Sequence, residues 1–311
     1  MGAARHLALL PEAGGERIVW PVPFADGLPI LHGLRGRRTV ALASGDPFWF
    51  GAGSVIVQGL APGAWRAYPG RATFALAAAR LGWPLESTLC TGLHAAPLER
   101  LRPALAPGLR AIVLLRDGAA VAALARYLTE EGFGDSTLTV MEALGGPRER
   151  LTRATAATLG GAFAHPVTVA VEVAGAGRVL PCARGLDDDW FAHDGQITKR
   201  PVRALALSAL APCPGERLWD IGGGSGSVAV EWCLSHPTVT ALSIEPREVR
   251  AARIRANAAR FGLGERLSVV EGAAPAALDS LAPPQAVFVG GGLSAALMAA
   301  SRPARGLSPM P

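Results

Sequence analysis

The sequence predicts an α/β protein, and three observations carry the prediction. The apolar stretch 217–221 runs into a glycine-rich turn at 222–226, and a helix-compatible run follows at 228–234. This order of strand, turn and helix is typical of the start of a βαβ unit. Glycine suits the turn because it tolerates positive φ angles and lets main-chain N–H groups approach a ligand. Half of the residues are hydrophobic and 6% are aromatic, which favours Ala-, Leu- and Val-rich α/β layers over a β-sandwich. A length of 311 residues suits two domains.

The charge of the chain comes from arginine, since Lys199 is its only lysine and the net charge is +5. Arginine binds carboxylates through a fixed fork of donors, so a polyanionic substrate is expected, although general replacement of lysine by arginine would explain the same excess. No basic run is interleaved with aromatic residues, which argues against a nucleic-acid partner. The four cysteines form no C-x-x-C pair, so we predict no metal site and no disulfide framework.

The longest uncharged run, 280–301, contains two prolines and three consecutive glycines. These breakers predict a buried strand, a turn and a helix rather than a membrane span. The N-terminus lacks the apolar core of a signal peptide. We therefore expect a soluble, cytoplasmic protein with no membrane partner.

The spacing of the glycines distinguishes two classes of ligand. A dinucleotide-binding turn, G-x-G-x-x-G, would put its third glycine at 227, but Ser227 stands there and the third glycine is Gly226. The next predicted strand ends in Glu245, 25 residues after Asp220, where a carboxylate can accept hydrogen bonds from both hydroxyls of a ribose. The turn and its preceding acid resemble motif I of the class I S-adenosylmethionine-dependent methyltransferases, which have a Rossmann-like fold. A nicotinamide-dependent oxidoreductase is the less favoured alternative.

The resemblance implies a set of contacts to the cofactor S-adenosylmethionine. The segment 196–210 resembles the entry to the methyltransferase domain of the decarboxylating precorrin-6Y methyltransferases, whose Gln and Thr contact the cofactor. Many related enzymes have an acid at the position of Ala273, so a contact there would come from the main chain. The fourth predicted strand, 286–289, ends in glycines. The candidate cofactor residues of this region are Gln196, Thr198, Asp220, Gly222, Gly223, Gly224, Ser225, Gly226, Glu245, Ala273, Gly290 and Gly291.

A second candidate site lies in the N-terminal half. The apolar stretch 38–43 predicts a strand that ends in the turn 44–47, and the carboxyl ends of buried strands are where α/β sheets bind ligands. An ordinary turn has the same Ser-Gly-Asp-Pro composition, and the local residues leave the two interpretations open. The stretch 43–53 resembles the "GDP" signature of the tetrapyrrole methylases, which implies that Gly45 and Asp46 contact the cofactor. Resemblance to the precorrin-6Y branch of that family extends to 76–84, 92–94 and 142–150.

The two resemblances predict a two-lobed tetrapyrrole methylase domain followed by a Rossmann-like class I methyltransferase domain. We place the first domain at 1–180, with lobes at about 1–105 and 108–174, a linker at 174–189, and the second domain at 186–301. Only about twenty residues follow the strand 286–289, so we expect this domain to lack its last strands and 302–311 to be a disordered tail.

The other predicted elements are strands at 110–115, 136–141, 166–173 and 267–271, and helices at 120–127, 147–159 and 247–261. In the last helix we expect Val249, Ile254 and Ala258 to face inward and the arginines to face outward.

The resemblance also implies an activity. It is the S-adenosylmethionine-dependent C-methylation of precorrin-6Y at two ring-bridging carbons, with decarboxylation of an acetate side chain, in cobalamin biosynthesis. The partner would be this polycarboxylate corrin precursor, and the methyltransferase domain would form the contact of a homo-oligomer. No catalytic residue is predicted, since His94 and His193 could accept a proton but a solvated or core histidine is the simpler interpretation. The alternative is a shortened, inactive chain that binds the cofactor without turnover.

Overall fold

The computed structural model of the chain describes residues 1–11, 15–292 and 294–300. These residues fold into two compact units. Unit 1 consists of Met1–Ala95 and Gly108–Gly175, and unit 2 consists of Ala96–Pro107 and the described residues from Ala176 onward. The segment 96–107 therefore interrupts unit 1 in sequence while it folds with unit 2. The predicted tail 302–311 lies outside the described residues, and the predicted domain limits stay predictions.

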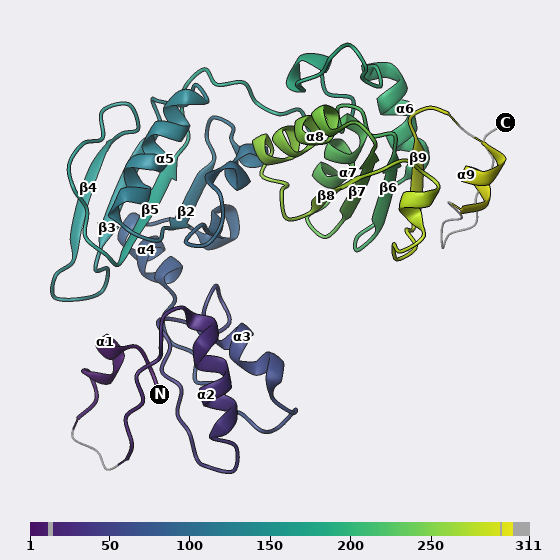
Figure 1. Ribbon diagram of the computed structural model, residues 1–311. Helices are drawn as coiled ribbons and strands as arrows, with labels where there is room; N and C mark the ends of the chain where they lie inside the picture. Colours follow the sequence, from purple (N-terminus) through teal and green to yellow (C-terminus); the bar gives the residue numbers. More distant parts are fainter. Residues whose placement is uncertain (12–14, 293, 301–311) are drawn as a thin grey trace. The chain divides into compact units, whose positions relative to one another are not determined.

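Unit 1 is built on one sheet. Its strands are β1 (Leu89–Gly92), β2 (Arg110–Leu114), β3 (Thr137–Glu142), β4 (Arg150–Thr155) and β5 (Val167–Glu172). They lie in the order β1-β2-β5-β3-β4, with β1 parallel to β2 and the other pairs antiparallel. In Figure 1 helix α5 (Gly118–Glu130) runs along this sheet, and its Val121, Leu124 and Leu128, spaced as one helical face, are fully buried. The helices before the sheet are α1 (Ala4–Leu7), α2 (Gly27–Gly33), α3 (Gly53–Ile56) and α4 (Thr73–Leu81).

The predicted strand at 38–43 is wrong. The segment has no regular secondary structure, no strand pairs with it among the described residues, and 38–41 are exposed. Its main chain hydrogen-bonds to Met1, through the carbonyl of Val40 (2.7 Å) and the N–H of Leu42 (2.9 Å). An apolar stretch becomes a strand only where a neighbour takes up its N–H and C=O groups, and the composition of one segment does not reveal that neighbour.

The predicted helix at 147–159 is also wrong, because strand β4 lies there. β4 pairs with β3 so that Arg150 stands opposite Glu142, and their side chains form an ion pair of 2.5 Å. The threonines at 152 and 155 suit a pleated strand, whereas the charged residues of this segment suit an exposed helix equally well. Strands β2, β3 and β5 and helix α5 confirm the other elements predicted in this part of the chain.

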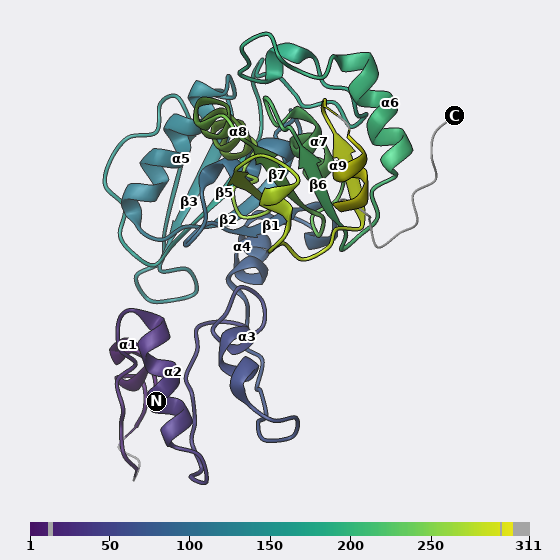
Figure 2. The ribbon, with the colours of Figure 1, turned by 45° about the vertical axis from the view of Figure 1, so that its right-hand side comes forward.

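Unit 2 is a parallel α/β layer structure. Its strands are β6 (Arg217–Ile221), β7 (Thr240–Glu245), β8 (Leu267–Glu271) and β9 (Ala286–Val289), and its helices are α6 (Arg200–Leu210), α7 (Ser227–Ser235), α8 (Glu248–Arg260) and α9 (Ala295–Ala300). The strands lie in the order β8-β7-β6-β9, all parallel. Helices α7 and α8 pack beside β7 and β8 (Figure 1, Figure 2), and their apolar residues share one core. These strands confirm the predicted βαβ order. None of the helices in the described ranges is both long and apolar enough to cross a membrane.

Helix α8 confirms the prediction for 247–261 but not all of its orientation. Ile254 and Ala258 are buried as expected, whereas Val249 is 73% exposed. The side chains of Arg250 and Arg253, expected to face outward, are only 17% and 20% exposed. Both form ion pairs with an acid far away in sequence, and helical periodicity alone does not anticipate that partner.

Part of the predicted linker 174–189 folds onto unit 2. Leu186 is 1% exposed and belongs to the same core as α7 and α8. The indole ring of the neighbouring Trp190 is also buried, and guanidinium groups lie over it, that of Arg178 at 4.0 Å and that of Arg102 at 5.0 Å from the ring centroid. Arg102 comes from the segment 96–107, which explains why that segment folds with unit 2.

Candidate functional site

The carboxyl ends of β6, β7 and β9 meet the glycine-rich turn at one edge of the parallel sheet. The N–H of Gly222 donates to the carbonyl of Ile244 at the end of β7 (2.8 Å). The N–H of Gly290, just after β9, donates to the carbonyl of Ile221 (2.8 Å). The structure thus brings together the turn and the residues after two neighbouring strands, at the edge where parallel α/β sheets bind ligands.

Glycine is required in the turn because its inner side is tightly packed. A Cβ at Gly223 would overlap the hydroxyl of Ser243, and a Cβ at Gly226, where φ is 74°, would lie 2.7 Å from Ile254 Cγ2. On the outer side, a Cβ at Gly222 would meet no described atom within 4 Å. The turn is therefore pressed against β7 and α8 while its outer main chain stays open to a ligand.

Glu245 lies at the end of β7 and is only 3% exposed. Its Oε2 accepts a hydrogen bond from the N–H of Gly224 (2.9 Å), and its Oε1 accepts one from the N–H of Arg247 (3.1 Å). A carboxylate offers about four lone-pair positions, so about two remain for the hydroxyls of a ligand. The bond to Gly224 holds the acid and the turn in a fixed relation.

Asp220 lies beneath the turn and is 1% exposed. Its Oδ2 accepts a hydrogen bond from the hydroxyl of Ser243 (3.3 Å), the residue opposite it on β7, and the N–H of Ala229 is a second donor. Burial raises the pKa of Asp220 to about 7, the two hydrogen bonds oppose the rise, and the nearby charge of Glu245 adds to it. Asp220 therefore supports the turn from inside the unit.

A short segment beside the turn, residues 192–198, is called the strap below. Asn257 of α8 joins it to the turn. The side-chain amide of Asn257 donates to the carbonyls of Ala192 (3.0 Å) and Ser225 (2.8 Å), and its Oδ1 accepts from the N–H of Ala192 (2.9 Å). One buried side chain therefore fixes the start of the strap and the middle of the turn together.

Gln196 and Thr198 occupy the second half of the strap. The main-chain oxygen of Gln196 lies 3.5 Å from the position that a Cβ on Gly224 would take. The carbonyl of Thr198 accepts a hydrogen bond from Arg203 of α6. Arg203 is fully buried, and its Nε donates to the equally buried Glu231 of α7 (2.5 Å). The structure thus places Gln196 at the turn and anchors Thr198 in the core.

Four further predicted residues lie around the same edge. Ser225 is 1% exposed, and its hydroxyl has no hydrogen-bond partner among the described residues. Ala273 follows β8, and Gly290 and Gly291 follow β9, all three exposed. An open glycine turn, a carboxylate with spare lone pairs and an unpaired buried hydroxyl suit a ligand with ribose hydroxyls and an amino-acid group. The residues present therefore fit S-adenosylmethionine.

The predicted cofactor residues of unit 1, Gly45 and Asp46, lie in a turn that follows no strand among the described residues. Gly45 has a φ of 62°, and Asp46 Oδ1 accepts a hydrogen bond from the N–H of Phe48 (2.8 Å). This is the geometry of an ordinary Asx turn. Phe48 is 46% exposed, and His94, the histidine considered as a proton acceptor in this unit, is exposed as well. Contact of Gly45 and Asp46 with a cofactor stays a prediction.

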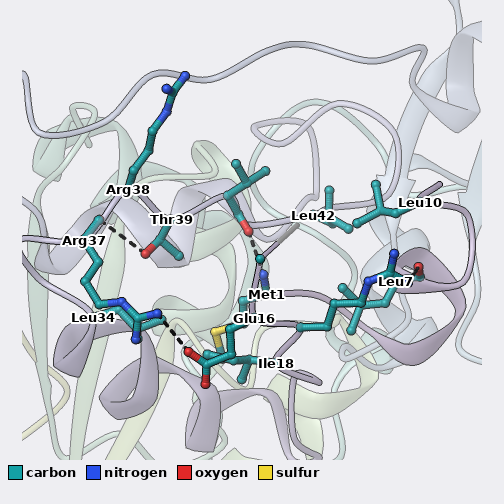
Figure 3. Close-up of a pocket in the computed structure, with 13 residues that line it drawn as sticks. Met1, Leu7, Leu10, Glu16, Ile18, Leu34, Arg37, Arg38, Thr39 and Leu42 are labelled. Carbon is teal, nitrogen blue, oxygen red and sulfur yellow. Dashed lines mark hydrogen bonds and ion pairs between the residues drawn. The ribbon is translucent and has the colours of Figure 1, made fainter. Parts of the chain in front are cut away.

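A cavity of about 380 Å³ lies in the N-terminal part of unit 1 (Figure 3). Its wall combines apolar side chains, among them Leu7, Leu34 and Leu42, with the ion pair between Arg37 and Glu16 (2.8 Å). None of the predicted site residues lines it. The cavity is therefore separate from both candidate sites.

Sequence reasoning missed the side chains that hold the site of unit 2 together. Asn257 carried a signal, since it is an amide three residues after Ile254 on the buried side of an amphipathic helix. Arg203 carried a weaker one, a charge among the apolar residues of α6. His193 was considered as a proton acceptor, and in the strap its Nδ1 accepts a hydrogen bond from the N–H of Gly195 (3.1 Å).

Comparison with protein families gives two matches along the chain. The model of the tetrapyrrole (corrin/porphyrin) methylases matches residues 32–160. The model of the precorrin methyltransferase domain matches residues 189–306. The first match covers the turn at Gly45 and Asp46, and the second covers the strap, the glycine-rich turn and Glu245.

Individual relatives cover both matches at once. The chain is 49% identical, over 295 residues, to the precorrin-6Y C(5,15)-methyltransferase (decarboxylating) of Sinorhizobium sp, an alignment that covers 94% of this chain and 71% of the relative. It is 43% identical to the protein of the same name from Mycobacterium tuberculosis (strain CDC 1551 / Oshkosh), over 94% of this chain and 74% of the relative. Among solved structures, the C-terminal domain of precorrin-6Y C5,15-methyltransferase from Rhodobacter capsulatus is 55% identical, with 39% of this chain and 64% of that chain covered and a TM-score of 0.37.

Proposed function

The chain belongs to the family of the precorrin-6Y C(5,15)-methyltransferases (decarboxylating), and we propose that it methylates precorrin-6Y at two ring-bridging carbons and removes the carboxyl group of an acetate side chain as carbon dioxide. The methyl donor we propose is S-adenosylmethionine, and the reaction belongs to cobalamin biosynthesis. The observation that carries the proposal is the buried pairing of Glu245 with the N–H of Gly224 at the carboxyl edge of a parallel sheet.

Unit 2 would bind the donor through this edge. Glu245 would accept hydrogen bonds from the ribose hydroxyls with the lone pairs that Gly224 and Arg247 leave free. The unpaired hydroxyl of Ser225 would bind a polar atom of the amino-acid part, and the main chain at Ala273 would contact the adenine. The donor supplies an electrophilic methyl group on a sulfonium. The chain supplies position, since alignment of the methyl group with the acceptor carbon accounts for much of the rate of such a transfer.

Unit 1 would serve the other methyl transfer. The match of the tetrapyrrole methylase model to 32–160 supports this assignment, because two different methyltransferase models on one chain suit a reaction with two methylations. Gly45 and Asp46 are the donor contacts we propose there. The arginine-rich composition and the net charge of +5 favour a polycarboxylate acceptor such as a corrin precursor. A cytoplasmic location and a homo-oligomer remain predictions from the sequence.

The first test is calorimetric titration of the purified chain with S-adenosylhomocysteine. We expect the site in unit 2 to bind it, apart from any binding by unit 1, and we expect Glu245→Ala to weaken the unit 2 site by roughly tenfold to a hundredfold, because the loss of hydrogen bonds to a buried charged acceptor is worth about 1–3 kcal/mol. Gly224→Val should weaken binding as well, since its side chain would stand between the turn and the ligand. Glu248→Ala is the matched control, an exposed acid three positions further along the chain.

A folded chain that binds no S-adenosylhomocysteine would contradict the donor assignment. If binding is found, turnover with precorrin-6Y decides the rest of the proposal. Transfer of label from a methyl-labelled donor to the corrin, accompanied by release of carbon dioxide, is the expected result. Binding without either product would identify the chain as one that holds the donor but does not carry out this reaction.

A further inference from the structure

We propose that Asp194 is a positioning residue, which holds the strap against the glycine-rich turn and so keeps Gln196 in place for the donor. The inference rests on the proposed function, because it concerns the same donor site of unit 2. It goes beyond that function in assigning a role to a residue outside the turn, outside Glu245 and outside every contact predicted from the sequence.

Asp194 uses one carboxylate oxygen within the strap and the other to connect the strap to α8. Oδ1 accepts a hydrogen bond from the N–H of Gln196 (3.1 Å) within the strap. Oδ2 accepts one from Arg250 Nε (2.9 Å) and lies 3.0 Å from a terminal nitrogen of Arg253. The carboxylate therefore stabilises a turn within the strap and binds that turn to two neighbouring arginine side chains of α8.

The same face of α8 also contacts the turn. Residues 250, 253, 254 and 257 are spaced so that they share one side of the helix. On this side Ile254 packs under Gly226, 2.7 Å from the position that a Cβ on this glycine would take, and Asn257 binds the carbonyl of Ser225 (2.8 Å). Helix α8 is thus a common support, with the turn held by Ile254 and Asn257 and the middle of the strap held by Asp194.

The ends of the strap have supports of their own. Asn257 fixes Ala192 through both main-chain groups, and Arg203 fixes the carbonyl of Thr198. Loss of the Asp194 carboxylate would therefore free the middle of the strap, at Gln196, while both ends stay attached. Because the main-chain oxygen of Gln196 lies beside Gly224, the change should reach the donor site without disturbing the core.

Several features argue that this arrangement is more than a surface ion pair. The side chains of Arg250 and Arg253 are only 17% and 20% exposed, so the two arginines are shielded from water, while the carboxylate of Asp194 binds them from the surface. Hydrogen bonds from Arg250 and Arg253 hold the pKa of Asp194 well below its usual range, so the carboxylate stays charged at ordinary pH. A charge held by hydrogen bonds from Gln196 and Arg250 and by the ion pair with Arg253 suits a structural contact better than a proton carrier.

The experiment compares S-adenosylhomocysteine affinity and melting temperature for the full chain and three variants. Asp194→Ala should weaken binding about tenfold and leave the melting temperature within a few degrees. Asp194→Asn keeps an acceptor for the N–H of Gln196 but loses the charge, so we expect an intermediate loss of about threefold. Arg255→Ala is the matched control, because Arg255 also lies on α8 and also forms an ion pair, with Glu271 (2.7 Å), but does not touch the strap.

Each outcome supports or overturns the inference. Weakened binding in both Asp194 variants, with Arg255→Ala unchanged, supports it. Wild-type binding in Asp194→Ala overturns it while leaving the donor site of unit 2 intact. Equal loss in Asp194→Ala and Arg255→Ala also overturns it, since any ion pair on α8 would then have the same effect. Absence of binding in the unmodified chain rejects the proposed function, and this inference with it.

A positioning role differs from a purely structural one in amide exchange. In Asp194→Ala the main-chain amide of Gln196 should exchange faster with solvent, and saturating S-adenosylhomocysteine should slow it again. If Asp194→Ala is too unstable to measure, the pair Arg250→Met and Arg253→Met tests the same contact from the helix side. Unchanged affinity in that double variant would overturn the inference equally well.

Discussion

The glycine-rich turn at 222–226 follows a strand that is hydrogen-bonded on both sides, whereas the turn at 44–47 follows an irregular segment with no strand beside it among the described residues. In the first turn, side chains from β7 and α8 pack against the glycines. In the second, the hydrogen bond from the N–H of Phe48 to Asp46 spans only two residues. A glycine-containing turn thus has a sheet beneath it in one unit and lacks one among the described residues of the other.

The comparison shows that the residues of a turn do not by themselves determine how firmly the turn is held. The sheet beneath the turn contributes that support. The turn of unit 2 can hold an acid and an amide in a fixed relation because β6 lies between β7 and β9. The turn of unit 1 has the local bond to Asp46 and contacts from the Ser44 hydroxyl to the side chains of Arg5 and His6, but no strand lies beside it in the described part of the chain. Stability should therefore respond strongly to changes around the first turn and weakly to changes in the second.

The largest effect is expected from the buried ion pair below the strap. Arg203→Met removes the charged partner of Glu231 and leaves the buried carboxylate with hydrogen bonds only from the N–H groups of Gly185 and Leu186 among the described residues, and breaking a buried ion pair on one side costs about 3–5 kcal/mol in the free energy of unfolding. Denaturant unfolding measures the loss. Lys199→Ala, which removes an exposed ion pair with Asp188, is the control and should change the free energy by less than about 0.5 kcal/mol. Similar losses in the two variants would show that the core network does not support this unit.

The next effect concerns pH. Burial holds the pKa of Asp220 at about 7 in the folded chain, against an ordinary value of 3.8, so the folded state binds this proton more tightly than the unfolded state. The stability that the proton contributes is complete below about pH 4 and is lost as the pH rises toward 7. Relative to Asp220→Asn, the unmodified chain should lose roughly 3–4 kcal/mol over this range. Parallel pH profiles for the two proteins would refute the prediction.

A smaller effect separates steric overlap from backbone strain. Gly223→Ala places a Cβ against the hydroxyl of Ser243 and should cost about 1–3 kcal/mol, and Ser243→Ala in the same chain should recover much of that loss. Gly45→Ala meets no atom closer than 3.5 Å but must adopt a φ of 62°, which costs about 1 kcal/mol. Chemical denaturation of the single and double variants measures both effects. Failure of Ser243→Ala to rescue Gly223→Ala would contradict the packing described for the turn.

The smallest effect is expected at the turn of unit 1. Asp46→Ala removes the hydrogen bond to the N–H of Phe48 and should lower the free energy of unfolding by about 0.5–1 kcal/mol. Asp46→Asn keeps an acceptor and should remain close to the unmodified chain. A loss of several kcal/mol for Asp46→Ala would mean that this turn has support comparable with that of unit 2, and the contrast between the two turns would no longer hold.

The parts of the fold that could be predicted from sequence are those with a local cause. The strand, turn and helix around Gly222 follow from apolar runs broken by glycine, and Glu245 follows from its place at the end of the next strand. The strand predicted at 38–43 failed because a strand needs a neighbour. Helical periodicity shows which side of a helix is apolar, and on that basis the arginines of α8 were assigned to solvent. The assignment failed because the acid that binds them, Asp194, lies more than fifty residues earlier in the sequence.

The folding of the segment 96–107 with unit 2 means that a single cut cannot divide this chain into its two units. Protease cleavage at the junction near Gly175 would leave unit 2 with its sheet and its glycine-rich turn, but Arg102 would remain on the other fragment. One face of the Trp190 indole, covered by that guanidinium at 5.0 Å, would then be open to water. After such a cleavage, the packing of 96–107 on unit 2 would still hold the two fragments together. Tryptophan fluorescence should therefore change when the fragments separate.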